Sequence, residues 1–221
     1  MAFIDDLTII LNLMILACAV VFYTGFLVWW HTRKKDLERA YSHLKEGALL
    51  MALLGGLVGA IALWGEFTWP IKGNSAYNLY FFDPLFMLAL LLVAFGVTVW
   101  NRLPTHFVGM LGLVIGSGAI YYGVRAELYL SLTREPVETL LLYLGFGAMG
   151  ILALPATLYT DWFVTGPTNP ASAPLPSGPE PTYPRVWSAL LLVFLAVVVL
   201  AGIAALLYGF STAWAHLESP P

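Results

Sequence analysis

Six long apolar runs alternate with shorter, more polar segments along the chain. A helix that crosses a bilayer needs about 20 apolar residues, and only helices or closed barrels satisfy every backbone hydrogen bond in lipid. Barrel strands would instead be short and alternate in polarity. The pattern therefore predicts an all-α, polytopic integral membrane helix bundle, with residues 1–221 forming a single transmembrane domain. Its six transmembrane helices are predicted at residues 7–30, 47–65, 84–100, 105–124, 139–160 and 186–210.

Two of the intervening segments have distinctive patterns. Residues 69–84, WPIKGNSAYNLYFFDP, are aromatic and begin and end near proline. Asp83 and Pro84 have the pattern of a helix N-cap followed by proline at the first helical position, so the third helix is predicted to begin there. Residues 166–184 hold half of the chain's 14 prolines and are interpreted as an extended tether between the fifth and sixth helices.

Composition and charge place the chain in the membrane. It is 60% hydrophobic and 10% charged, where a soluble domain has about 25% charged residues. The predicted partner is therefore the lipid bilayer, and a net charge of −3 argues against nucleic acid. The N-terminal acidic pair and the length of the first apolar run indicate a retained span rather than a cleaved signal peptide.

The distribution of Lys and Arg predicts the orientation. The first, third and fifth loops carry seven of these residues, and the remaining loops carry three. The side with more positive charge faces the cytoplasm in most membrane proteins. We therefore expect a multi-pass protein of the cell membrane with its N- and C-termini on the outer side.

The pattern WP…YNLYFFDPLF, within a small six-span protein, resembles the domain of unknown function 981 family. That family consists of small polytopic membrane proteins, mostly archaeal. The resemblance covers the first five spans, whereas the proline-rich segment and the last span are the parts least expected to match. It implies no activity and no catalytic residues.

Candidate chemistry is sparse. The central thirds of the six spans contain no Asp, Glu, Lys, Arg or His, and Asn12 is predicted to form a hydrogen bond between helices. His31, His43 and His106 fall at span ends, where solvated histidines are the favoured interpretation, although His31 and His43 could approach each other. We predict no catalytic residue, no metal site and no cofactor, and leave haem or quinone open, since a quinone site needs only a few polar and aromatic groups.

Two sets of residues are the candidate functional positions. Small residues at GxxxG spacing let helices approach closely, either within the chain or against another chain. The packing candidates are Gly55, Gly59, Gly112 and Gly116. The outer loop is a candidate docking surface or pocket, although capping and interfacial anchoring are the favoured roles there. Its residues are Glu66, Trp69, Tyr77, Tyr80 and Asp83, with Tyr121, Tyr122, Arg125 and Glu127 expected on the same side.

These observations favour a non-catalytic integral membrane subunit of a larger complex, such as a respiratory or other redox assembly, with other integral membrane subunits as partners. One alternative is a small-solute channel or transporter whose substrate enters near Glu66 and Asp83. Another is a haem- or quinone-binding membrane redox protein.

Overall fold

The computed structural model describes residues 6–68, 75–130, 133, 136–165 and 185–218. Within these ranges, six helices are long and apolar enough to cross a membrane, which confirms the predicted all-α class. Short π-helical segments, η1 (Arg125–Tyr129) and η2 (Asp161–Thr165), continue two of them. The six helices are α1 (Asp6–Arg33), α2 (Leu37–Thr68), α3 (Ser75–Trp100), α4 (His106–Val124), α5 (Pro136–Thr160) and α7 (Arg185–Glu218).

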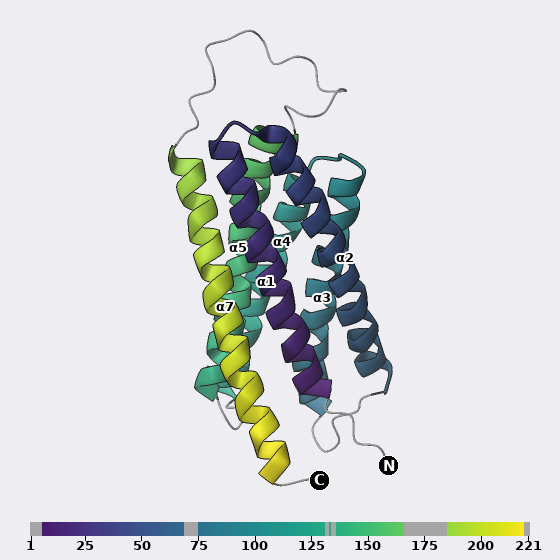
Figure 1. The fold of residues 1–221 in the computed structure, drawn as a ribbon. Helices are drawn as coiled ribbons and strands as arrows, with labels where there is room; N and C mark the ends of the chain where they lie inside the picture. The colour runs from purple at the N-terminus through teal and green to yellow at the C-terminus, as the bar shows by residue number, and fades with distance from the viewer. Residues whose placement is uncertain (1–5, 69–74, 131–132, 134–135, 166–184, 219–221) are drawn as a thin grey trace.

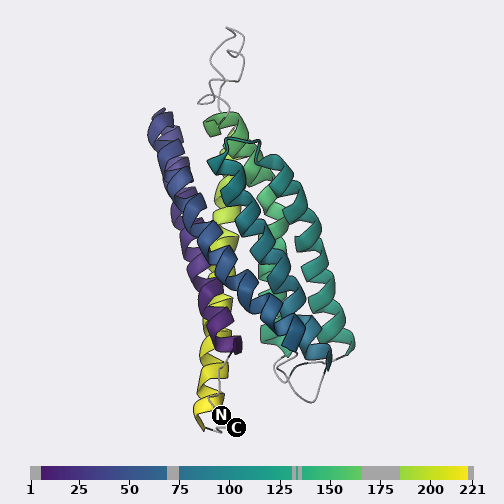
Figure 2. The same cartoon turned by 90° about the vertical axis from the view of Figure 1, so that its right-hand side faces the viewer.

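The helices form two layers of three. In Figure 1, α7, α1 and α2 lie in front of α5, α4 and α3, and Figure 2 shows the same arrangement from the side. Each helix contacts the next one along the chain, and α7 contacts α1, so the six form a closed ring. The contacts between α2 and α3 and between α4 and α5 are the most extensive, whereas those between α3 and α4 are the least extensive.

The two ends of the bundle differ in character. We call the end where α1 begins and α7 finishes the terminal end, and the opposite end, where α1 meets α2 and α3 meets α4, the basic end. At the basic end, cationic side chains stack on aromatic rings: Lys34 lies 4.4 Å from the Trp30 ring centroid, and Lys45 lies 4.2 Å from that of Trp100. Such amphipathic pairs suit a membrane–water interface.

Glycines set the tight contacts between neighbouring helices. A Cβ atom on Gly116 would lie 2.4 Å from the Gly147 carbonyl oxygen in α5, and one on Gly112 would lie 3.1 Å from the Gly150 carbonyl oxygen. Gly55 and Gly59 similarly lie against Ala89 of α3. A Cβ atom on Gly55 would lie 2.9 Å from the Ala89 carbonyl oxygen, and one on Gly59 would lie 3.3 Å from the Ala89 Cβ. The four packing candidates therefore contact helices of the same chain.

Two sequence-based predictions are wrong. The third helix begins at Ser75 rather than at Asp83 and Pro84, so Pro84 lies inside α3. The helix extends past the local cap signal because Phe82, Leu85, Ala89 and Leu92 recur at helical spacing and are all buried. Asn12 is exposed rather than buried, because its neighbours on the helix, Leu11 and Met14, face the interior instead. The second predicted span, residues 47–65, lies inside α2, which begins at Leu37, so most of the basic first loop is helical.

Replacing Gly116 with Ala will destabilise the protein, because the new methyl group meets rigid backbone atoms of α5. Overpacking of this kind costs about 1–3 kcal/mol. Gly118→Ala is the matched control, since a Cβ there has nothing within 4 Å. Thermal unfolding of the detergent-purified variants should show a lower melting temperature for G116A alone, and equal melting temperatures would contradict the packing described here.

Candidate functional site

A partly open cavity of about 220 Å³ lies between the two layers of helices. All six helices contribute to its lining, and α1 and α5 do so along most of their length, from Ile10 to Val28 and from Leu142 to Thr160. At a rise of 1.5 Å per residue, each of these stretches is about 27 Å long, which approaches the thickness of a bilayer's hydrocarbon core. The cavity is therefore long and narrow.

The lining is almost entirely apolar. No charged residue occurs among the described residues that line the cavity. Two lining hydroxyls towards the basic end are engaged within their own helix: Thr157 donates to the Leu154 carbonyl oxygen at 3.0 Å, and Thr160 donates to that of Ala156 at 3.0 Å. An apolar cavity of this kind excludes water and accepts apolar molecules.

At the terminal end, a proline and a tyrosine from different helices act together. Pro84 has no N–H group, so the carbonyl oxygen of Tyr80, four residues earlier, lacks its usual partner within α3. The Tyr143 hydroxyl, from α5, donates a hydrogen bond to that carbonyl oxygen. The two tyrosine rings also stack, with centroids 4.6 Å apart and planes inclined by 7°. Tyr143 also lines the cavity, so this contact lies beside its terminal end.

A buried carboxylate lies beside this tyrosine pair. Glu127, in η1, is only 3% exposed. Its Oε2 atom accepts hydrogen bonds from Thr133, at 2.9 Å from the hydroxyl and 3.3 Å from the backbone nitrogen. Glu127 interacts electrostatically with both Tyr80 and Tyr143, and the Tyr80 hydroxyl lies within hydrogen-bonding reach of its carboxylate.

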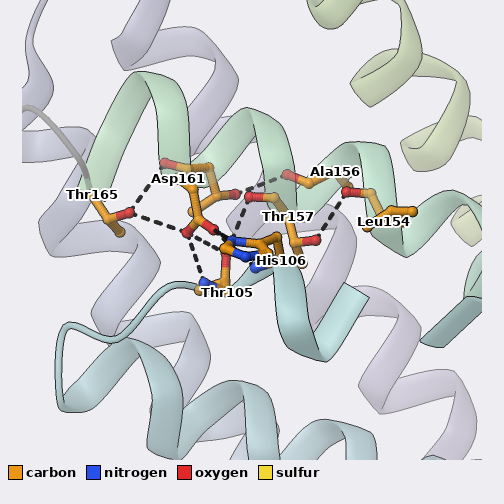
Figure 3. Close-up of polar contacts among 8 residues, drawn as sticks. Thr105, His106, Leu154, Ala156, Thr157, Asp161 and Thr165 are labelled. Atoms are coloured by element: carbon orange, nitrogen blue, oxygen red, sulfur yellow. Dashed lines mark hydrogen bonds and ion pairs between the residues drawn. The ribbon is translucent and has the colours of Figure 1, made fainter. Parts of the chain in front are cut away.

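At the basic end, Asp161 caps α4 from another helix (Figure 3). The Thr105 side chain makes no N-cap hydrogen bond of its own. Instead, Asp161 accepts the backbone N–H groups of Thr105 at 2.8 Å and His106 at 2.9 Å. Its carboxylate also lies 2.8 Å from the Thr105 hydroxyl and 2.8 Å from Nδ1 of His106, and 3.3 Å from the Thr165 hydroxyl. This network fixes the start of α4 to the end of α5.

The described residues among those predicted for the outer loop differ in their surroundings. Tyr80 is buried at 3% exposure, whereas the Glu66 and Asp83 carboxyl groups contact each other and are half-buried. Trp69 lies outside the described residues, as does the side chain of Tyr77. Of the four residues expected beside this loop, Glu127 is buried, whereas Tyr121, Tyr122 and Arg125 are exposed.

Three of the four histidines, His31, His43 and His106, lie at the basic end. The rings of His31 and His43 lie 5.1 Å apart, as predicted, and each has a carboxylate 3.6 Å from its Nδ1 atom, Asp36 and Glu46 respectively. No group of three potential metal ligands occurs in the described part of the chain. Sequence reasoning missed Asp161 and Tyr143, which lie outside any motif and act on residues of other helices.

The chain belongs to the family described as "Protein of unknown function (DUF981)", which matches residues 1–219. The predicted resemblance is thus confirmed, and it extends beyond the first five spans to include the last helix. Comparisons with curated proteins and with solved structures gave no match.

Replacing Tyr143 with Phe will lower the free energy of unfolding by about 1 kcal/mol, because it removes the donor to the Tyr80 carbonyl oxygen. In a Pro84→Ala background, the N–H group of residue 84 can donate to that carbonyl within α3, so the same change should cost less. A double-mutant cycle of thermal stability measures this coupling. Equal costs in both backgrounds would show that Tyr143 does not compensate for Pro84.

Replacing Asp161 with Asn will destabilise the start of α4, because an amide offers one acceptor atom where the carboxylate offers two. The loss should be about 2 kcal/mol, or a fall of about 4–8 °C in melting temperature. The matched control is Glu38→Gln, which removes an exposed carboxylate in the first turn of α2. If both variants melt alike, Asp161 does not carry the capping role.

Proposed function

We propose that this member of the DUF981 family holds a molecule with a long hydrocarbon chain, of the membrane lipid or isoprenoid quinone type, inside its helix bundle. The observation that carries the proposal is the long apolar cavity between the two layers. This proposal is closest to the quinone-binding part of the haem- or quinone-binding alternative, and it departs from the complex-subunit hypothesis.

The energetic argument concerns the cost of leaving the cavity empty. Apolar side chains that line an empty space lose the dispersion contacts that a neighbouring atom would supply, and an apolar cavity does not hold water favourably. An apolar ligand that fills the cavity removes much of this penalty, and a bilayer supplies such molecules at high concentration.

The shape of the cavity selects the ligand class. A volume of this size spread along about 27 Å accommodates one extended chain better than a wide macrocycle such as haem. The seam between α3 and α4 is the natural route of entry, because these neighbours have the least extensive contact in the ring. Both helices also line the cavity there, through Leu88 and Leu91 of α3 and Ile115 and Ala119 of α4.

The other two functions receive less support from the geometry. The subunit hypothesis drew on the GxxxG faces, and the four glycines of those faces pack against helices of the same chain. A channel for small polar solutes needs polar groups along its path, and the described lining of the cavity is apolar.

Filling the cavity tests the proposal. Leu91→Trp places a large ring into the lining at mid-membrane, whereas Leu90→Trp, the matched control, changes a side chain that is 44% exposed on the same helix. The wild-type protein and L90W should co-purify from native membranes with a stoichiometric long-chain molecule, detected by native mass spectrometry and solvent extraction. L91W should lose it. A wild-type protein without a bound molecule, or equal retention by L91W, would refute ligand binding in the cavity.

A further inference from the structure

We infer that the outer face of α1 binds an anionic phospholipid at the basic end of the bundle. The lipid phosphate lies at Arg33 and Lys34, and one acyl chain follows a stack of exposed aromatic rings on the same helix. Neither cation is among the residues that line the cavity, so this surface site is separate from it. The inference therefore goes beyond the proposed function.

The first observation is a continuous stack of exposed aromatic side chains along α1. Phe22, Phe26 and Trp30 recur every four residues, with ring centroids 6.2 Å and 6.3 Å apart and planes inclined by 18° and 21°. The three side chains are 37%, 38% and 41% exposed. Because α1 is the middle helix of its layer, between α7 and α2, the stack lies on the outer face of that layer (Figure 1).

The second observation is a pair of cations where this stack reaches the basic end. The Lys34 ammonium nitrogen lies 4.4 Å from the Trp30 ring centroid. The central guanidinium carbon of Arg33 lies 5.2 Å from the ring centroid of Trp29, whose ring lies beside that of Trp30. Both cationic side chains are exposed. Since a ring covers only one side of each cation, the other side can contact an anion.

The carboxylate nearest to this pair in the sequence is engaged elsewhere. Asp36 lies 3.5 Å from Nε of Arg39 and 3.6 Å from Nδ1 of His31. In the part of the chain that the structure describes, neither Arg33 nor Lys34 forms an ion pair. The positive charge of both side chains is therefore not neutralised by contact with a carboxylate.

The helices on either side of α1 were also considered as sources of a compensating charge. Glu38, in the first turn of α2, is exposed and forms no ion pair with Arg33 or Lys34. The neighbour on the other side, α7, begins with Arg185, which is a further exposed cation at the same end. The complementary partner is thus an anion, and exposed cations at a membrane surface attract anionic lipids.

The dimensions of this surface favour a lipid over a soluble anion. Lys34 follows Phe22 by 12 residues, which corresponds to about 18 Å along a helix. One leaflet supplies about half of a hydrocarbon core that is about 30 Å thick. A phospholipid whose phosphate contacts Lys34 can therefore lay an acyl chain along the whole stack, whereas a soluble phosphate would contact the cations alone.

The test compares two phospholipids with identical chains on the delipidated full-length protein in detergent. Dioleoyl phosphatidylglycerol has a net negative charge, and dioleoyl phosphatidylcholine has none. Native mass spectrometry measures the competition between them, and the melting temperature is the second measurement. The wild-type protein should prefer phosphatidylglycerol about 25-fold, since each cation contributes about fivefold. Leu91→Trp should keep this preference, because it fills the cavity and leaves the outer face of α1 unchanged.

Variants of the cations assign the preference to this site. Lys34→Gln should reduce the preference to about fivefold, and Lys34→Arg, which keeps the charge, should retain it. Arg39→Gln is the matched control, because it removes a cation at the same end that is already paired with Asp36. This control should keep the wild-type preference.

A variant of the ring stack tests the path of the acyl chain. Phe26→Ala interrupts the stack, so it should lower the affinity for both lipids about threefold without changing the preference between them. The matched control is Phe107→Ala, which removes a ring that is 66% exposed on α4, in the opposite layer. That control should leave both affinities unchanged.

Several results would overturn the inference. Equal affinity for the two lipids would do so, as would a loss of preference in R39Q as large as that in K34Q, or equal effects of F26A and F107A. If glycerol phosphate, an anion without acyl chains, stabilises the protein as much as phosphatidylglycerol does, the partner is not a lipid. If K34Q keeps the preference and lowers the melting temperature equally with and without lipid, Lys34 serves only the end of α1. The co-purification experiment with L91W tests the cavity separately, so none of these results decides the proposed function.

Discussion

Close contact between backbones is the constraint on which this structure depends. In a bilayer, helices gain little by burying apolar side chains against each other, because lipid is equally apolar, so association relies on close packing. The glycines of α4 approach the backbone of α5, and those of α2 approach α3. The most extensive contacts therefore lie within two antiparallel hairpins, α2 with α3 and α4 with α5. The middle helices of the two layers, α1 and α4, have no comparable interface. The long cavity between the layers is a consequence of this pairing.

The few polar side chains inside the bundle tie this arrangement together from α5. Asp161 at its basic end holds the start of α4, and Tyr143 near its terminal end holds the point in α3 where Pro84 interrupts the hydrogen bonding. In lipid, no water is present to satisfy these backbone groups, so each contact from α5 removes part of the cost of an unpaired group. The helices on either side of the weakest seam, α3 and α4, are thus both anchored to α5. That anchoring lets the seam itself stay loosely packed.

The sequence alone predicted where the membrane-spanning helices lie along the chain, but it did not predict which helices contact each other. Apolar runs of bilayer length predicted the six spans, because this signal is local to each segment of the chain. The cap at Asp83 and Pro84 was also a local signal, and it failed because Tyr143, about 60 residues away, satisfies the carbonyl that an internal proline leaves free. Glycine spacing likewise predicted close packing without saying against which helix. The capping role of Asp161 could not be predicted from the sequence, because the two N–H groups that it accepts belong to another helix and reach it only in the folded bundle.

The polar groups near the two ends of the cavity are already engaged within the protein. At the basic end, Thr157 and Thr160 donate to carbonyl oxygens of their own helix, and Asp161 is occupied by the start of α4. At the terminal end, the Tyr143 hydroxyl donates to the Tyr80 carbonyl oxygen, and Glu127 accepts from Thr133 and neighbours the Tyr80 hydroxyl. These side chains therefore stabilise the bundle itself, and an occupant of the cavity would be held mainly by contacts between its hydrocarbon chain and the apolar lining.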